Sequence, residues 1–203
     1  PKPFDRRVLI WEAADVAEAA INEGIAAIKP EDFDKQAYKE SLEARFGMSY
    51  SVMRGVFNQV KGKGKKIVFP EGDNEKIIRA AAQLVELDIC KPILLGNVKT
   101  IQNKMDELNL EFEHEKYNPR YDSRRIGEYD KALTTKRNRK GMTIVDAQRL
   151  LKSRPYFAAQ MVVNGDADGF LGGISRNYGD VLRPCLEVIG SDEDSHCAVG
   201  CYM

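Results

Sequence analysis

Two hydrophobic patterns divide the chain near residue 48. In residues 12–28, alanine, valine and isoleucine recur every three or four positions, and residues 31–47 begin with acidic side chains and end at a glycine. Both features predict amphipathic helices. Residues 49–64 repeat the helical spacing and also end at glycines. The amino-terminal part is therefore predicted to be helical and to carry little chemistry.

From residue 65 onward, short apolar runs alternate with amphipathic segments. A repeated order of strand and helix predicts a parallel sheet with right-handed crossovers, and ligands of such sheets bind beyond the carboxyl ends of the strands. We therefore expect an α/β fold that is doubly wound, with a mainly parallel sheet, helices on both faces and a preceding helical segment. The expected strands are residues 65–70, 91–97, 110–115 and 169–173, and the expected helices are residues 73–87, 98–109, 124–141, 143–151, 155–165 and 179–190.

Turn and cap residues predict where two of these helices begin. Thr143 and Asp146 have the spacing of a capping box, in which each side chain accepts a hydrogen bond from the other's backbone. Pro155 suits the first turn of the next helix, because its missing N–H has no partner there, and Gly165 suits the end of that helix. Two consecutive helices are therefore expected on either side of residue 153.

Four acidic residues lie close to the ends of predicted strands. Glu71 and Asp73 follow the first strand and are expected to cap the helix after it. Asp166 and Asp168 precede the fourth strand, where they could coordinate a divalent cation or form a turn through hydrogen bonds to the backbone. Because no further carboxylates cluster nearby, the turn is the favoured interpretation, and no metal site is assigned.

The overall charge and the cysteines exclude several classes of protein. Lys and Arg together number 31, as do Asp and Glu, so no basic field attracts the chain to nucleic acid or to an anionic membrane. No apolar run reaches the roughly 18 residues of a membrane span. The four cysteines, two of which (Cys197 and Cys201) lie near His196, form neither a secreted disulfide pattern nor a four-ligand zinc site. We therefore expect a cytoplasmic protein.

Basic residues gather locally although the net charge is zero. Between Tyr121 and Arg154 there are ten Lys or Arg residues and four Asp or Glu residues. The GKGK sequence at residues 62–65 lacks the spacing of a phosphate-binding loop, so it is expected to be a solvated turn, and no G-x-G-x-x-G motif supports a dinucleotide site. Arg137, Arg139 and Lys140, in KRNRKG, and Arg183, in VLRP, are candidate phosphate ligands, because cationic side chains attract phosphate and a guanidinium also supplies forked donors. On spacing alone, solvated surface charge is the favoured interpretation of these residues.

Several separated motifs resemble known enzyme families. In order along the chain, three segments resemble the amino-terminal part of the phosphate acetyltransferase family: KKIVFPEGDNEKIIRAAAQLVELDICKPILLGN, KRNRKGMTIVDAQ and PYFAAQMVVNGDADGFLGGISRNYGDVLRP. A fourth, PKPFDRRVLIWEAADVAEAAINEGIAA, resembles the last part of the NADP-binding malic domain of bacterial hybrid malic enzymes. The resemblance implies a malic-domain tail in residues 1–48, a first α/β domain in residues 49–190 and the start of a second domain in residues 191–203. The chain is accordingly expected to be a piece of a longer polypeptide.

The resemblance also implies a fold and a ligand. The implied fold is that of isocitrate and isopropylmalate dehydrogenases, with acyl-CoA held in a cleft between two domains. Arg137 and Arg183 match two family arginines that bind coenzyme A. In this interpretation Gly169, Gly172 and Gly173 let the end of the fourth strand lie close to that ligand.

Three functions remain open at this point. The favoured one is an acyl-CoA-sensing, regulatory domain of an NADP-dependent malic enzyme, which converts malate to pyruvate and CO2; the others are a working phosphate acetyltransferase and a module for oligomerisation. The resemblance places the family's catalytic serine, arginine and aspartate beyond Met203, so no catalytic residue is assigned. Residues 176–179 are Arg, Asn, Tyr and Gly, where stand-alone enzymes carry small hydroxyl residues. This difference favours regulation over transfer.

The favoured function implies a set of cofactors and partners. Coenzyme A or acetyl-CoA is the expected ligand, whereas NADP and a divalent metal are expected only in the malic domain. The remaining expected partners are the rest of the same polypeptide and further copies in a homo-oligomer. The chain by itself is expected to be inactive.

Overall fold

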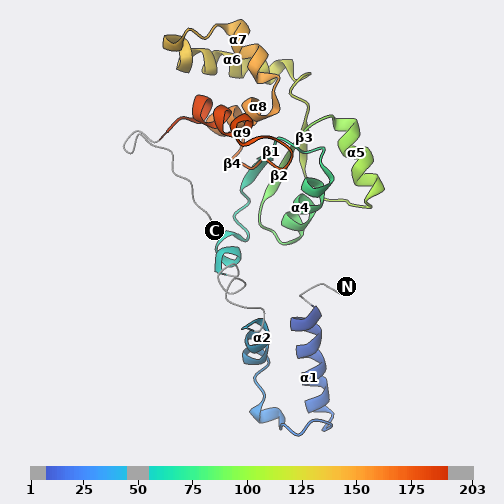
Figure 1. Ribbon diagram of the computed structural model, residues 1–203. Helices are drawn as coiled ribbons and strands as arrows, with labels where there is room; N and C mark the ends of the chain where they lie inside the picture. Colours follow the sequence, from blue (N-terminus) through green and yellow to red (C-terminus); the bar gives the residue numbers. More distant parts are fainter. Residues whose placement is uncertain (1–7, 45–54, 192–203) are drawn as a thin grey trace. The chain divides into compact units, whose positions relative to one another are not determined.

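The structure is a computed structural model that describes residues 8–44 and 55–191 (Figure 1). The chain forms two compact units that divide between Val60 and Lys61. The predicted boundary at residue 48 lies outside the described residues. So do residues 192–203 of the predicted second domain, which include His196, Cys197 and Cys201.

The first unit consists of short helices, as its hydrophobic pattern predicts. A π-helical turn, η1 (Val8–Glu12), leads into α1 (Ala13–Asn22), and a 3-10 turn, η2 (Pro30–Asp32), precedes α2 (Lys35–Ala44). Apolar residues from both helices are buried between them, and Lys35 of α2 pairs with two carboxylates of α1. Residues 55–60 are also helical.

The second unit is built on a parallel sheet of four strands. They are β1 (Lys66–Phe69), β2 (Lys91–Leu95), β3 (Glu115–Tyr117) and β4 (Gly169–Phe170), and their order in space is β3-β2-β1-β4. The chain thus adds strands on one side of β1 and then returns to its other side. All three pairings are parallel, which confirms the predicted sheet.

Helices cover both faces of this sheet. Successive side chains of a strand point to opposite faces, so neighbouring residues of one strand pack against different helical layers. Phe69 and Leu94 pack with α4 (Glu75–Glu86) and α5 (Val98–Glu107). On the other face, Val68, Ile93 and Leu95 pack with α6 (Ser123–Arg137), α7 (Ile144–Leu151) and α8 (Arg154–Val163). The two helical layers are visible on either side of the strands in Figure 1. The predicted α/β arrangement is therefore confirmed. The other described helices of this unit are η3 (Asn138–Lys140), α9 (Tyr178–Pro184) and η4 (Cys185–Ile189).

Local signals at helix ends are mostly confirmed. Thr143 and Asp146 form the capping box of α7, and Pro155 lies in the first turn of α8. Gly165 adopts a positive φ just after α8 ends. The cap of α4 was predicted wrongly, because its side-chain acceptor is Asn74 and not Glu71 or Asp73.

Two strands differ from their predicted limits. β3 begins at Glu115, because the apolar residues just before it (Leu110 and Phe112) pack under α5 without pairing with β2. β4 ends at Phe170, short of the predicted limit at residue 173, and Leu171 is 57% exposed although its backbone N–H donates to Val68. Gly173 then adopts a φ of +115°, which turns the chain away from the sheet. At β3 the apolar residues and the paired strand are therefore different parts of the chain.

No helix in residues 8–44 or 55–191 combines the length and the apolar character that a membrane crossing requires. The GKGK segment is the exposed turn predicted before β1, with Gly62 and Gly64 both at positive φ.

Candidate functional site

A buried carboxylate joins the two loops at the carboxyl ends of β1 and β4. Glu71, which is 3% exposed, accepts hydrogen bonds from the backbone N–H groups of Gly173 (2.7 Å), Ile174 (3.0 Å) and Ser175 (2.7 Å). The Ser175 hydroxyl donates a fourth. Burial opposes ionisation of Glu71, but the hydrogen bonds from Ser175 and the two preceding residues hold its pKa below the ordinary value. Glu71 therefore fixes the loop that leads to α9.

Three glycines near this carboxylate lie in tight contact with the rest of the protein. A Cβ on Gly72 would lie 2.8 Å from both the Cα of Leu94 and the backbone N of Leu95. A Cβ on Gly169 would lie 3.0 Å from Ile67, and one on Gly172 would lie 3.1 Å from the Phe170 ring. At Gly72 the neighbouring atoms include backbone, whereas at Gly169 and Gly172 they belong to side chains, which can shift. The interpretation drawn from the sequence, that Gly169 and Gly172 let a ligand approach, stays a prediction.

Asp73, in the same loop as Glu71, anchors the start of α8. Its two carboxylate oxygens each accept a hydrogen bond of 2.7 Å from the guanidinium of Arg154. Burial raises the pKa of Asp73, but the hydrogen bonds and the charge of Arg154 outweigh burial and lower it. Arg154 is the first residue of α8, so this fork-to-fork pair holds the helix against the carboxyl end of β1.

Arg183 borders a hollow of about 750 Å³ beside α8 and α9, which we call the Arg183 hollow. In the part of the chain that the structure describes, no hydrogen bond or ion pair engages its exposed side chain. Tyr156 and Glu187 also line the hollow, and the Tyr156 hydroxyl donates to the Glu187 carboxylate over 2.6 Å. Burial and this hydrogen bond raise the pKa of Tyr156 to about 12. Arg176 lines the hollow as well, and its side chain also has no hydrogen bond or ion pair to a described residue. The hollow thus offers two uncommitted guanidiniums next to a neutral phenol.

Arg137 reaches the same neighbourhood from α6 but is already engaged. Its Nη1 donates to the carbonyl oxygen of Glu187 over 3.2 Å, and its Nη2 lies 3.8 Å from the Glu187 Oε1. The buried Nε of Arg137 has no partner among the described residues. Glu187 therefore lies close to both predicted site residues. Arg137 is not among the residues that line the Arg183 hollow.

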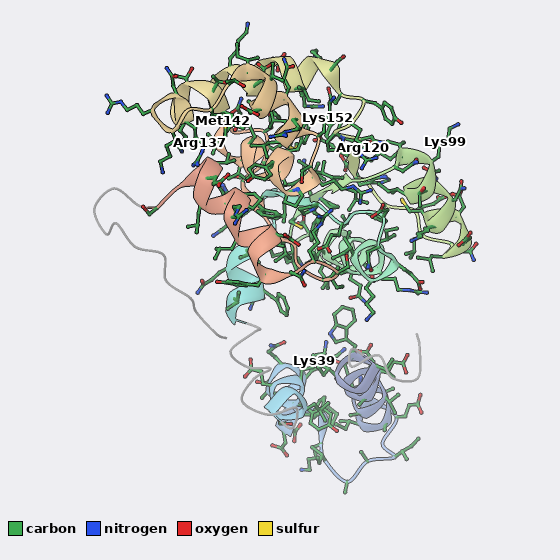
Figure 2. The ribbon with its side chains drawn as sticks, turned by 45° about the horizontal axis from the view of Figure 1, so that its top comes forward. Lys39, Lys99, Arg120, Arg137, Met142 and Lys152 are labelled. Carbon is green, nitrogen blue, oxygen red and sulfur yellow. The ribbon has the colours of Figure 1, made fainter. Side chains whose placement is uncertain are left out.

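A second hollow, of about 960 Å³, lies beyond the carboxyl ends of β2 and β3; we call it the basic hollow. The described residues that line it include no carboxylate. Its cationic side chains are Arg120, Arg149, Lys152, Arg154 and Arg176. Arg120 and Lys152 lie close together in Figure 2, apart from Arg137. Ser153 and Arg176 line both hollows, so the two are neighbours.

The two aspartates near β4 serve the fold. Asp168 accepts from Lys65 (2.7 Å) and from the backbone N–H of Lys66 (2.8 Å), and Asp166 accepts from the Tyr129 hydroxyl. Within residues 8–44 and 55–191 no group of three or more His, Cys, Asp or Glu side chains could hold a metal ion. Both carboxylates thus bind residues far along the chain, whereas the sequence predicted hydrogen bonds to the nearby backbone of a turn.

Sequence reasoning missed the roles of Glu71 and Arg154 and the existence of the basic hollow. The partners of Glu71 are more than 100 positions away along the chain, so no local pattern reports them. The only available signal for the hollow was the position of Arg120, three residues after β3, and of Arg154 at a helix start. Both positions belong to the ligand-binding edge of a parallel sheet.

Comparison with known proteins places this geometry in a family. A family model described as phosphate acetyl/butaryl transferase matches residues 51–201. The chain is 32% identical over 203 residues to an NADP-dependent malic enzyme of Escherichia coli (strain K12), which covers 98% of this chain and 26% of that protein. It is 35% identical over 134 residues to a phosphate acetyltransferase of Staphylococcus aureus (strain MRSA252), which covers 65% of this chain and 40% of that protein.

Solved structures agree. A phosphotransacetylase from Streptococcus pyogenes superposes with a TM-score of 0.65 at 31% identity, covering 70% of this chain and 43% of that one. This chain spans about a quarter of the length of the malic enzymes it matches. The family model covers most of the chain, including the strands, both hollows and the two predicted arginines. The chain therefore belongs to the phosphate acetyl/butaryl transferase family.

Proposed function

We propose that this chain binds acyl-CoA through Arg183 and Arg137 and regulates an NADP-dependent malic enzyme of which it forms a part. The observation that carries the proposal is Arg183, an arginine without an intramolecular partner among the described residues, at the edge of a hollow. A guanidinium in such a place can hold a phosphate by forked, charge-assisted hydrogen bonds. Similarity to malic enzymes over 98% of the chain supports the larger context.

Glu187 would couple ligand binding to a change in the conformation of the protein. Its carboxylate accepts from Tyr156 and lies 3.8 Å from Arg137, so it occupies the position that a ligand phosphate would take beside Arg137. Binding of a phosphate at Arg137 would displace Glu187 and shift η4, the turn that follows α9. A ligand that prefers the displaced arrangement would change the population of the two states.

The wider setting follows from the same proposal. The acyl-CoA would lie in a cleft completed by a second domain, as in the isocitrate and isopropylmalate dehydrogenase arrangement. The malic part of the polypeptide would bind malate, NADP and a divalent metal and release pyruvate and CO2. We also propose a cytoplasmic homo-oligomer. A symmetric assembly with two states would carry the effect of acyl-CoA binding to the malic part of each subunit.

A working phosphate acetyltransferase is the second candidate. It is favoured by the 35% identity to the enzyme of Staphylococcus aureus. It is disfavoured by residues 176–179, of which Arg176 and Gly179 line the Arg183 hollow. The resemblance implies small hydroxyl residues at these positions in stand-alone enzymes, and this chain lacks them.

Two assays on the full-length protein separate these functions. We expect acetyl-CoA to change malate-dependent NADPH formation by a coupling free energy of about 1–3 kcal/mol. We expect no acetyl-CoA to form from acetyl phosphate and coenzyme A. Robust transfer, together with malate kinetics that acetyl-CoA leaves unchanged, would favour the acetyltransferase instead.

Substitution of the arginines tests the binding site. Arg183→Ala or Arg137→Ala should weaken coenzyme A binding about tenfold or more, because each removes a charge-assisted hydrogen bond worth about 1.5–3 kcal/mol. Arg183→Lys should restore part of the affinity, since lysine keeps the charge and loses the fork. Calorimetry with coenzyme A measures the affinities of these variants. Dephospho-coenzyme A, which lacks the 3′-phosphate, shows whether either arginine holds that phosphate. The matched control is Arg139→Ala, an exposed arginine in the same basic turn as Arg137; equal losses in the control would contradict the assignment.

A further inference from the structure

Most of the cationic side chains in the basic hollow have no partner within the described part of the protein. Of its five cationic side chains, Arg154 is held by both oxygens of Asp73, and Arg149 lies 3.3 Å from Asp146. The other three (Arg120, Lys152 and Arg176) have no hydrogen bond or ion pair from the side chain to any described residue. Holding like charges together costs free energy unless an anion neutralises them. Three uncompensated cations around one hollow therefore point to an anion with more than one negative charge.

The hollow lies where the backbone also favours an anion. It follows the last residues of β2 and β3, and it is bordered by Ser153 and Arg154 at the start of α8. No side chain caps α8 and its first turn contains no acidic residue, and the Asp73 carboxylate beside this positive end of the helix is already paired with Arg154. Cationic side chains and helix dipole thus act on the same space.

Other lining residues indicate what the anion carries. Tyr121 is 82% exposed and lines the hollow, so its ring is free to stack against a planar group. Asn97 and Asn118 use their side-chain oxygens to accept local backbone N–H groups. Their amide NH2 groups remain as donors on the rim. A planar heterocycle with hydrogen-bond acceptors, joined to several phosphates, matches these groups.

We propose that the basic hollow is a separate subsite for the phosphates of a nucleotide that carries two or more of them, with its base against Tyr121. Arg120, Lys152 and Arg176 hold the phosphates, and Arg154 is a positioning residue because Asp73 fixes it. The nucleotide is either a free one or the nucleotide end of coenzyme A, which can extend from the Arg183 hollow because Ser153 and Arg176 line both. Only the second source rests on the proposed function.

The test uses the full-length protein with ATP, pyrophosphate, coenzyme A and adenosine as probes in calorimetry. ATP should bind and adenosine should not, and the affinity for ATP should fall as salt is raised, since ions screen exposed charges. The double variant Arg120→Ala/Lys152→Ala should bind ATP and pyrophosphate about tenfold or more weakly, since two charge-assisted contacts are lost. The charge-matched control is Lys63→Ala/Lys91→Ala, which removes two exposed lysines at the opposite, amino-terminal edge of the sheet. Circular dichroism and thermal melts check that both variants fold.

The same variants distinguish the two sources. If coenzyme A fills both hollows, the double variant and Arg183→Ala both lose affinity for coenzyme A, and ATP competes with coenzyme A. If a free nucleotide is the ligand, the double variant loses ATP but keeps coenzyme A, and Arg183→Ala does the reverse. The proposal is overturned if neither ATP nor pyrophosphate binds, or if the lysine control weakens binding as much as the double variant. Failure of the proposed function alone would appear as unchanged malate kinetics with the ATP result intact.

Discussion

Replacing Glu71 by glutamine should loosen the loop that leads to α9. Each carboxylate oxygen of Glu71 accepts two hydrogen bonds, one oxygen from Gly173 and Ile174 and the other from the N–H and hydroxyl of Ser175. Glutamine has nearly the same shape but offers one oxygen and one NH2 group. Its NH2 group must therefore face donors, and the best arrangement directs it at Ser175, whose hydroxyl can turn to accept.

The magnitude follows from the bonds that are lost or weakened. The Ser175 N–H loses its acceptor, and a hydrogen bond to a charged group contributes about 1.5–3 kcal/mol. The bonds from Gly173 and Ile174 persist but lose the charge of their acceptor. We expect Glu71→Gln to lower the free energy of unfolding by about 3 kcal/mol. Ser175→Ala removes one hydroxyl and leaves the three N–H bonds, so it should cost only about 1 kcal/mol.

Urea unfolding followed by circular dichroism measures these losses, and hydrogen exchange of residues 173–175 reports the loop itself. The pKa of Glu71 is lowered in the fold from its ordinary value of 4.5. Its stabilising effect is therefore complete above pH 4.5 and is lost as the pH falls through the lower, folded-state pKa. The difference between wild type and Glu71→Gln should shrink in that acidic range. A loss below about 0.5 kcal/mol at neutral pH, the size of an ordinary surface substitution, would refute the reasoning.

Two further substitutions test neighbouring features. Gly72→Ala should destabilise the domain by more than about 1 kcal/mol, because the new Cβ would lie 2.8 Å from the Cα of Leu94 and a backbone cannot yield cheaply; unchanged urea unfolding would contradict this. Tyr156→Phe removes the donor to Glu187 and should cost about 1 kcal/mol. Because folding raises the pKa of Tyr156 from 10.0 to about 12, its contribution is full below pH 10 and is lost as the pH rises through 12. The phenylalanine variant should therefore lose less stability than wild type across that alkaline range, as pH-dependent thermal melts would show.

The fold was largely predictable because burial imposes periodicity. Alternating apolar residues in β1 and β2 face two helical layers, and the amphipathic helices between them show their buried stripe at three- and four-residue spacing. Strand limits were less predictable, since hydrogen bonding decides them. The apolar residues at 110–112 are partly buried without joining the sheet, whereas Glu115 and Tyr117 pair with β2.

The candidate site was predictable only where a motif carries it. Arg183 is recognisable from VLRP, and the structure leaves it without an intramolecular partner among the described residues. The engagement of Arg137 with Glu187 joins residues 50 positions apart. Asp73 looks like a helix cap from its place after β1, yet it binds Arg154 from another helix. Long-range pairs of this kind depend on the assembled fold, so a single sequence does not report them.

The position of Glu71 explains why the candidate ligand-binding side chains lie on either side of the point where the strand order of the sheet reverses. Ligands of doubly wound sheets bind at this point, here between β1 and β4, and the consecutive N–H groups of residues 173–175 form the kind of concave donor cluster that binds anions. Glu71 already fills that cluster with a carboxylate of the protein. An incoming phosphate would have to displace a buried, four-fold hydrogen-bonded group, which costs more than binding an uncommitted guanidinium. Cations without a partner among the described residues line the two flanking hollows instead: Arg183 lines one, Arg120 and Lys152 line the other, and Arg176 lines both.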